Sequence, residues 1–455
     1  MSAHPPLLDP LFRGPIAVLF NDDHRLQRML DFEAALSRAE AKAEVIPAAA
    51  VPLVEAKCRS ELFDFQALAN AAASAGNLAI PMVQQLTALV AAEDPGAARF
   101  VHWGATSQDV IDTGLVLQLR EALNWMEPQL HALGNSIAKL ADRHRATLMA
   151  ARTLLQQALP TTFGLKAAGW LDTLARHLMR LREIRGRDLT LQFGGAAGTL
   201  AALREKGTTV ASALAQELNL PQPDAPWHSH RDRFAEIAAV LGLLAGTLGK
   251  IARDVTLLMQ TEVAEVREPT GDDRGRSSAM PHKHNPVGSV VALAAATRVS
   301  GLVSTMLTAT ILDHERGVGG WHAEWETLAD IVTLTGGSLL QMSGVVSGLQ
   351  IDSDAMLKNL QRTHGQIMAE AVATGLAERA GLANAYLIVQ QACAKAAAEG
   401  TELRDALTSD TRVTRALPVA DLDRLLNPRN YLGSSERLID RILESWRAAN
   451  DYSTD

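Results

Sequence analysis

Length, composition and charge set the first limits on this chain. It has 455 residues, of which 21% are charged, and its formal net charge is −8. This balance gives no support for nucleic-acid binding, which needs a basic face, but it is compatible with a locally positive site for an anionic substrate. The two cysteines, Cys58 and Cys393, have no metal-ligand spacing and are expected to be reduced thiols of a cytoplasmic protein.

Helical patterns begin near the N-terminus. Aromatic residues make up only 4% of the chain, whereas its alanines and leucines favour helix. The periodicity predicts an amphipathic helix around residues 26–41, whose apolar positions are interleaved with Arg25, Arg28, Asp31, Glu33 and Arg38. A second helical run is expected over residues 63–92, with a kink at Pro81.

The centre of the chain predicts longer helices. Apolar residues recur at steps of three or four from Ile111 to Leu140, and a heptad seam runs from Ile237 to Leu258. Five long helices are expected, over residues 111–140, 160–184, 232–258, 286–312 and 325–349. Because such apolar helices need partners on several sides, we predict an all-α central bundle that packs against other copies of the chain. A monomeric bundle is the alternative.

Domain organisation and membrane association follow from the same pattern. Helices shorten after residue 352, and we predict an N-terminal helical domain, a central long-helix bundle and a small C-terminal helical domain over residues 1–110, 111–350 and 351–455. The most apolar stretch, 287–312, carries an arginine and several hydroxyl residues. It is therefore expected to be a buried bundle helix and not a membrane span. No strongly alternating strand pattern is evident.

Residues 102–109 form a polar segment just before the first long helix. Thr106, Ser107 and Asp109 are ordinary N-terminal cap residues, so capping alone explains at least one of them. Free backbone N–H groups and hydroxyls at this position would also bind a carboxylate. Capping does not require His102, which makes the segment a candidate binding site.

Two further polar segments, 152–164 and 314–322, are less specific. Arg152 and Gln156 could point into a cleft. Arg316 stands beside a histidine and a glutamate, which could form a surface ion-pair cluster. The glycines that follow it suggest a close approach of the backbone instead.

Residues 271–286 form the polar segment with the clearest chemistry. It carries Ser277, Ser278, Lys283 and Asn285, and its prolines prevent a continuous helix. A mobile loop that holds a hydroxyl nucleophile or base beside a lysine suits a lid that closes on an anion. The alternative is a solvated linker.

This last segment resembles a signature of the fumarase/aspartase superfamily, Gly-Ser-Ser-x-Met-Pro-x-Lys-x-Asn-Pro. The chain reads Arg276-Ser277-Ser278-Ala279-Met280-Pro281-His282-Lys283-His284-Asn285-Pro286. It departs from the family at Arg276, which replaces the glycine, and at His284, which replaces the arginine usual between the lysine and the asparagine. Residues 102–109 and 314–316 resemble the His-x-Gly-x-Thr-Ser-x-Asp and His-Glu-Arg segments of the adenylosuccinate lyase branch. The resemblance implies an all-helical, three-domain homotetramer with a core of about twenty helices and active sites built from three subunits. It implies no metal, no cofactor, no nucleic acid and no membrane.

One position separates the branches of this superfamily. The lyases of the superfamily have Thr-His-x-Gln where this chain has residues 153–156, and their histidine is a general acid or base. Here Leu154 stands in place of that histidine and cannot move a proton. The bacterial 3-carboxy-cis,cis-muconate cycloisomerases also lack that histidine, although those compared carry Trp there and His at the position of Gln157. They resemble the chain at residues 192–197, 226–228, 257–262, 280–283 and 321–327. This resemblance implies cofactor-independent lactonisation of 3-carboxy-cis,cis-muconate to 4-carboxymuconolactone, in the protocatechuate branch of the β-ketoadipate pathway of aromatic degradation.

The resemblance also implies roles for the polar residues. Ser277 would exchange the α proton of the substrate, with Ser278 as its neighbour and possible substitute. Lys283 and Asn285 would grip the carboxylate that becomes enolate-like, with Arg316 as a second cationic anchor. The other expected substrate-binding residues are His102, Thr106, Ser107, Arg152 and Gln156. Two alternatives remain: a lyase that acts on a succinyl-type adduct such as adenylosuccinate, and a structural tetramer that has lost catalysis.

Overall fold

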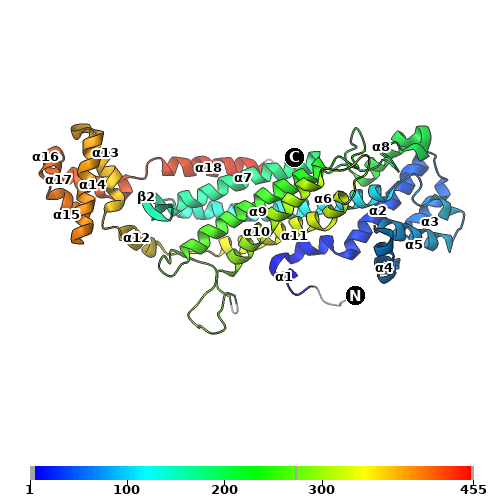
Figure 1. Ribbon diagram of the computed structural model, residues 1–455, viewed down its shortest axis with the longest axis horizontal. Coiled ribbons are helices and arrows are strands. Elements are labelled where there is room, and N and C mark those ends of the chain that lie inside the picture. Colours follow the sequence, from blue (N-terminus) through cyan, green and yellow to red (C-terminus); the bar gives the residue numbers. More distant parts are fainter. Residues whose placement is uncertain (1–5, 272–273, 452–455) are drawn as a thin grey trace. The chain divides into compact units, whose positions relative to one another are not determined.

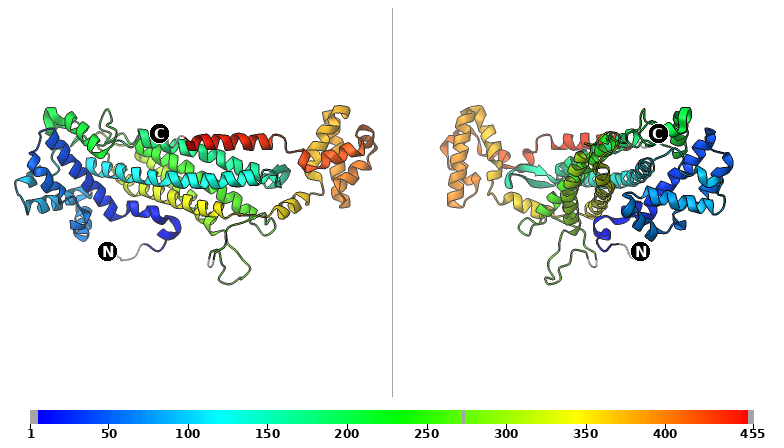
Figure 2. Two further views of the ribbon diagram at one scale, coloured as in Figure 1. Left: turned by 180° about the vertical axis from the view of Figure 1, so that it is seen from behind. Right: turned by 45° about the vertical axis from the view of Figure 1, so that its right-hand side comes forward.

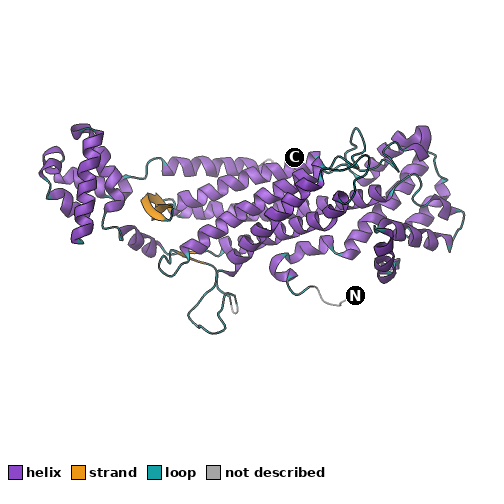
Figure 3. Ribbon diagram, in the orientation of Figure 1, coloured by secondary structure: helices purple, strands orange, loops and turns teal. Residues whose placement is uncertain are grey.

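The computed structural model describes residues 6–271 and 274–451, which are mainly α-helical (Figure 3). They form two compact units. Unit 1 contains the residues up to Leu130 together with His177–Gly249 and Val291–Gln341. Unit 2 contains His131–Arg176, Lys250–Val290 and the residues from Met342 onward. The predicted all-α class is confirmed, while the division into three domains stays a prediction.

Short helices form the N-terminal part of unit 1 (Figure 1). They are α1 (Asp9–Phe12), η1 (Gly14–Phe20), α2 (Asp22–Lys42), η2 (Ala48–Ala50), α3 (Val51–Glu55), η3 (Ser60–Leu62), α4 (Phe65–Ala75), α5 (Ala79–Ala91) and η4 (Ala97–Phe100). The single run predicted over residues 63–92 is wrong, because the chain breaks at Gly76, which has a left-handed φ of 76°. Pro81 does not kink a helix, since it lies in the first turn of α5, where its missing N–H is not needed.

Five long helices follow, as predicted. They are α6 (Ser107–Arg143), α7 (Phe163–Arg187), α9 (Asp232–Leu258), α10 (Val287–Ala309) and α11 (Gly320–Ser347). Within unit 1, their segments lie side by side in the views of Figures 1 and 2. Pro128 lies inside α6 without ending it. The remaining elements of unit 1 are η5 (Ala201–Lys206) and α8 (Gly207–Leu218), and α8 packs against α2.

Two of these helices, α9 and α10, are long and apolar enough to cross a membrane by length and composition alone, which is weak evidence for a span. In the most apolar stretch of α9, 61% of the residues are buried, but in that of α10 only 28% are. Within a single chain α10 is therefore mostly exposed, contrary to the expectation of a buried helix. Its exposed residues include Val290 and Leu307.

A β-hairpin in unit 2 was not predicted. Strands β1 (Leu148–Thr153) and β2 (Gln156–Thr162) pair in antiparallel register, so α7 begins at Phe163 and not at residue 160. Leu154 and Leu155 form the two-residue turn, with φ of 50° and 66°. Such turns favour Asn-Gly because both residues need positive φ. A second, minimal pair joins β3 (Val266–Arg267) to β4 (Gln350–Ile351).

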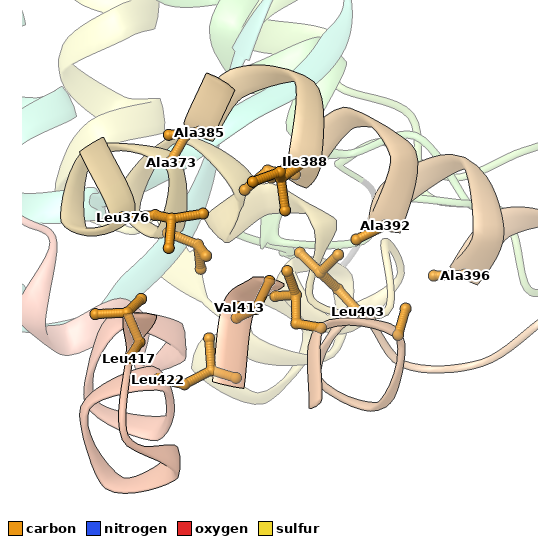
Figure 4. Close-up of a cluster of buried hydrophobic side chains, with 14 residues drawn as sticks. Ala373, Leu376, Ala385, Ile388, Ala392, Ala396, Leu403, Val413, Leu417 and Leu422 are labelled. Carbon is orange, nitrogen blue, oxygen red and sulfur yellow. The ribbon is translucent and has the colours of Figure 1, made fainter. Parts of the chain in front are cut away.

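The C-terminal part of unit 2 consists of shorter helices. They are α12 (Ser353–Gln361), η6 (Gln366–Met368), α13 (Ala369–Ala380), α14 (Leu382–Glu399), α15 (Leu403–Thr408), α16 (Thr411–Ala416), α17 (Val419–Leu426), η7 (Pro428–Asn430) and α18 (Ser435–Asp451). Leu376, Leu403, Val413 and Leu422 point into the core that α13–α17 enclose (Figure 4). Apolar burial of this kind accounts for the stability of these short helices.

Candidate active site

The N-terminus of α6 brings two of the predicted segments together in unit 1. Ser107 is the first residue of α6, and Asp109 reaches back to accept a hydrogen bond from the Thr106 N–H at 3.0 Å, which confirms the predicted cap. Arg316 donates from Nη1 to Thr106 Oγ1 at 3.1 Å and from Nη2 to the Ala196 carbonyl at 3.1 Å. Its Nε is enclosed and has no hydrogen-bond partner among the described residues. A cation and a helix N-terminus therefore meet here, which suits an anionic ligand.

Asp109 does more than cap α6. Its carboxylate is fully buried and accepts hydrogen bonds from the Gly194 and Gly195 N–H groups, each at 2.9 Å. His228 Nε2 lies 2.7 Å from the same carboxylate. A buried carboxylate with this many donors is fixed in position. Asp109 thus holds two distant loops against the start of α6.

His102 lies in the loop that leads into α6 and contacts Glu33 of α2. The imidazole Nδ1 is 2.6 Å from Glu33 Oε1. Burial alone would lower the pKa of His102, but the charge of Glu33, its hydrogen bond and the charge of Asp109 outweigh burial, so the pKa is raised above its ordinary value. Glu33 is itself 2% exposed. The amphipathic pattern, which grouped Glu33 with charged residues, gave no sign of this burial.

A second buried ion-pair cluster lies one helical turn further along α6. Arg231 donates to Asp112 (Nη1–Oδ2, 2.6 Å) and to Glu324 (Nη2–Oε2, 2.5 Å), and all three side chains are 1% exposed. Trp321 Nε1 also donates to Asp112, at 3.0 Å. Burial raises the pKa of Glu324 to about 7 despite the adjacent guanidinium of Arg231. We call Asp109, Asp112, His228, Arg231 and Glu324 the buried polar network.

Sequence reasoning missed the buried polar network. Asp109 was predicted only as a cap residue in a segment that resembles other proteins, and His228 only as part of another such segment. A usable signal was nevertheless present, because Asp112 and Glu324 interrupt strongly apolar helices. Charged residues at core positions are rare unless they are paired, so each predicts a partner elsewhere in the chain. That partner, Arg231, stands immediately before α9.

Arg152 and Gln156 lie at the turn end of the β1–β2 hairpin in unit 2. Arg152 forms a bidentate pair with Glu265, with Nη2–Oε1 at 2.6 Å and Nη1–Oε2 at 3.0 Å. Asn359 Nδ2 donates to the same buried carboxylate at 2.8 Å. Gln156 is exposed, and its side chain makes no hydrogen bond among the described residues. In this chain Arg152 is therefore engaged internally, whereas Gln156 is free to meet a ligand.

Residues 274–286, which we call the signature loop, have their two ends joined by backbone contacts, and we call this joined part the neck. The Asn285 N–H donates to the Gly275 carbonyl at 2.7 Å, and Arg276 pairs with His284 in an isolated antiparallel bridge. Gly275 has φ of 76°, and a Cβ on it would lie 2.6 Å from the Asn285 carbonyl oxygen. Only glycine fits this neck without strain.

The tip of the signature loop carries the predicted catalytic groups. Ser277 Oγ accepts a hydrogen bond from the Met280 N–H at 3.2 Å, an interaction that favours negative charge on the oxygen. The side chains of Ser278 and Lys283 are exposed, and that of Asn285 is half-buried. Within unit 2, no hydrogen bond joins Arg152 or Gln156 to the described part of the loop. The loop thus presents a hydroxyl and an ammonium group to solvent.

Comparisons with known proteins identify the family. The lyase family profile matches residues 13–301, and the profile of the adenylosuccinate lyase C-terminus matches residues 365–442. A 3-carboxy-cis,cis-muconate cycloisomerase from Pseudomonas aeruginosa is 53% identical over 97% of this chain and 96% of its own length. The chain belongs to the fumarase/aspartase superfamily. The enzyme of the same name from Bradyrhizobium diazoefficiens is 52% identical over 98% of this chain and 99% of its own. The crystal structure of the Pseudomonas putida 3-carboxy-cis,cis-muconate lactonizing enzyme superposes with a TM-score of 0.92, at 48% identity, covering 98% of this chain and 99% of that one.

Three residues depart from superfamily patterns, and the structure shows where each one lies. Leu154, where superfamily lyases have histidine, is the first turn residue of the hairpin, and its side chain is 96% exposed. Arg276 and His284, the two departures in the signature loop, face each other across the backbone bridge of its neck. The departures of the loop are thus confined to one pair, and its reactive groups match the superfamily signature.

Proposed function

We propose that this chain catalyses the cofactor-independent lactonisation of 3-carboxy-cis,cis-muconate to 4-carboxymuconolactone. The observation that carries the proposal is the 53% identity to the Pseudomonas aeruginosa cycloisomerase over 97% of the chain. The enzyme would serve aromatic degradation through protocatechuate, in the cytoplasm. Its two cysteines are free, as in a protein of a reducing compartment.

The reaction needs a folded substrate and stabilised negative charge. One carboxylate of the muconate attacks the β carbon of a double bond and forms the ring carbon–oxygen bond. The electron pair of that double bond moves to the α carbon and its carboxylate, and a proton then adds at the α carbon. Because the attacking carboxylate is already ionised, the attack requires no general base. This accounts for a functional enzyme with Leu154 in place of the superfamily histidine.

The polar groups described above suit the demands of this reaction. Arg316, with its unpartnered Nε, and the start of α6 at Thr106 and Ser107 would bind carboxylates of the substrate. Lys283 and Asn285 would grip the carboxylate that becomes enolate-like, where preorganised positive charge lowers the barrier most.

Ser277 is the group that would exchange the α proton, with Ser278 as its possible substitute. The Met280 N–H that donates to Ser277 Oγ supports this role, because it stabilises the oxygen that remains after the hydroxyl gives its proton to the α carbon. Gln156, exposed at the hairpin, and Arg152 beside it would complete the carboxylate contacts. Arg152 must loosen its pair with Glu265 to do so.

The active enzyme would be a homotetramer whose sites combine segments of three subunits. Support comes from apolar surface that a single chain leaves open. Only 28% of the most apolar stretch of α10 is buried. At the hairpin turn, Leu154 and Leu155 are 96% and 77% exposed while they occupy left-handed backbone conformations. Contacts with further copies of the chain would cover both features.

A second function, β-elimination from an adenylosuccinate-type adduct with release of fumarate, is favoured by one observation. Residues 365–442 match the profile of the adenylosuccinate lyase C-terminus. This match concerns the helices of the C-terminal part and not the reactive groups. Leu154 counts against the elimination, because it offers no general acid or base at that position.

A direct assay distinguishes these functions. Purified protein is mixed with 3-carboxy-cis,cis-muconate without added metal or cofactor, and loss of diene absorbance is followed beside a parallel reaction with adenylosuccinate. We expect turnover of the muconate alone. Turnover of adenylosuccinate alone would replace the proposed function by the lyase, and turnover of neither would support a structural tetramer.

A further inference from the structure

The contact between Glu33 and His102 orients an imidazole ring at the edge of the candidate site. The side chain of Glu33 is 1% exposed, whereas that of His102 is 15% exposed. The carboxylate therefore lies on the buried side of the ring, with Oε1 at 2.6 Å from Nδ1. A buried carboxylate needs a donor, so Nδ1 carries the proton and the ring orientation is fixed.

The other ring nitrogen is available for a ligand. Nε2 of His102 makes no hydrogen bond among the described residues and is not an enclosed atom. The backbone at His102 has φ of 56°, and that at Gly104 has φ of 73°. Left-handed conformations at a non-glycine residue cost free energy and often occur where a side chain is held for function. Four residues later the same loop reaches Thr106, which Arg316 contacts.

The charges around His102 favour its protonated form. The charged groups that act on the ring are Glu33 on α2 and Asp109 on α6, and both raise its pKa against the effect of burial. An imidazolium has N–H donors at both nitrogens. The ring would then present a charged donor from Nε2 to an anion.

We propose that Glu33 is a positioning residue that holds His102 as an imidazolium, so that Nε2–H binds one carboxylate of the tricarboxylate substrate. The proposal rests on the proposed function for the identity of the substrate. Glu33 itself does not touch the substrate and acts only through the orientation and charge of His102. The binding would be made equally in the ground state and the transition state, so that it affects KM more than kcat.

Glu33→Gln tests the proposal because it removes the charge and keeps an acceptor for Nδ1. The pKa of His102 should fall in this variant, because burial then acts against fewer charges that favour the imidazolium. We expect KM to rise roughly tenfold at about pH 8, with kcat changed less than about twofold, and the rise in KM to become smaller at about pH 6. Glu33→Asp, which keeps the charge, should restore part of the lost affinity at the higher pH.

Glu40→Gln is the matched control. Glu40 lies on the same helix, is fully buried, and neither of its carboxyl oxygens has a hydrogen-bond partner among the described residues. Burial, followed by the charge of Glu33, raises the pKa of Glu40 to about 9, so that its carboxyl is neutral at the pH of the assay. The substitution exchanges one neutral group for another, and we expect KM to match the wild type at both pH values.

The double variant Glu33→Gln/His102→Gln completes the test. If Glu33 acts through His102, the double variant should bind no worse than His102→Gln alone. Additive losses, an unchanged KM in Glu33→Gln at both pH values, or an equal loss in Glu40→Gln would overturn the proposal.

Binding of tricarballylate, a saturated tricarboxylate, separates this proposal from the proposed function. Calorimetry should show weaker binding by Glu33→Gln than by the wild type at about pH 8 and a smaller difference between the two proteins at about pH 6. A wild-type protein that binds tricarballylate in this manner but does not convert the muconate would overturn the proposed function and keep the role of Glu33. Equal binding by both proteins at the higher pH would overturn the role of Glu33.

Discussion

The buried polar network of unit 1 and the signature loop of unit 2 hold their polar groups in opposite ways. In the network, Asp109 and Arg231 are almost fully buried and have several partners each. In the loop, Ser278 and Lys283 are exposed, and the segment is closed by the backbone hydrogen bond and bridge of its neck. The network fixes the start of α6, whereas the loop leaves its polar side chains exposed, as the proposed closure on a substrate requires. Substitutions should therefore affect stability in the first region and turnover in the second.

The largest expected effect follows from breaking the network at its centre. Arg231→Met leaves Asp112 and Glu324 buried without their cation, and we expect the free energy of unfolding to fall by about 3–5 kcal/mol. Denaturant unfolding at matched protein concentration measures it. Arg176→Met, which removes an exposed pair with Asp172, is the control and should change stability by less than about 0.5 kcal/mol. Equal changes in both variants would contradict the contrast between the regions.

The opposite result is expected in the loop. Lys283→Ala removes the exposed ammonium that would stabilise the enolate-like carboxylate, and turnover of the muconate should fall by roughly two to three orders of magnitude. Thermal unfolding should be unchanged, since the side chain has no buried partner. Lys358→Ala, an exposed lysine of α12, serves as control in the same assay. A near-normal rate in Lys283→Ala would remove that lysine from the site.

The neck of the loop should show an intermediate effect. Gly275→Ala forces a Cβ to 2.6 Å from the Asn285 carbonyl oxygen at a φ of 76°, which costs about 1–2 kcal/mol locally. We expect turnover to fall about tenfold because Asn285 and Lys283 shift together. Gly76→Ala is matched in φ, also 76°, but nothing lies within 4 Å of its Cβ. Gly76→Ala should lower stability slightly and leave kcat unchanged. A similar loss of kcat in both variants would show that backbone strain in general, and not the geometry of the neck, causes the loss.

The smallest effect concerns pH. The pKa of Glu40 is raised to about 9 by burial, so the folded protein binds a proton that the unfolded chain releases at its ordinary, lower pKa. A carboxyl of this kind stabilises the protein at low pH, and this contribution is lost as the pH rises through about 9. Glu40→Gln should therefore flatten the fall in unfolding free energy between about pH 5 and pH 9, by about 1 kcal/mol or more. Parallel curves for the two proteins would show that Glu40 is ionised in the folded state.

Local pattern was sufficient for much of the fold. The apolar steps along α6, α9 and α11 predict their lengths to within a few residues, because long bundle helices bury a continuous stripe. The hairpin escaped prediction because its turn is Leu154-Leu155, without the glycine or asparagine that marks a primed turn. A kink was predicted at Pro81 within one helical run, but the chain breaks at Gly76, because a proline in the first turn of α5 disturbs no hydrogen bond.

The candidate site was predictable only as far as its segments carry recognisable motifs. The contact of Arg316 with Thr106 joins two segments that resemble superfamily motifs, so their proximity was implied. Glu33 lies in no such motif, and its partner His102 is 69 residues further along the chain. Burial of a charged helix residue by a distant loop is a property of the tertiary structure, which helical periodicity alone does not encode.

The bridge between Arg276 and His284 has a practical consequence for engineering the loop. The two residues are cross-strand neighbours at the neck of the signature loop, so a library that varies either position alone keeps its neighbour fixed. Varying both positions together samples compatible pairs and leaves the serines and the lysine of the loop unchanged.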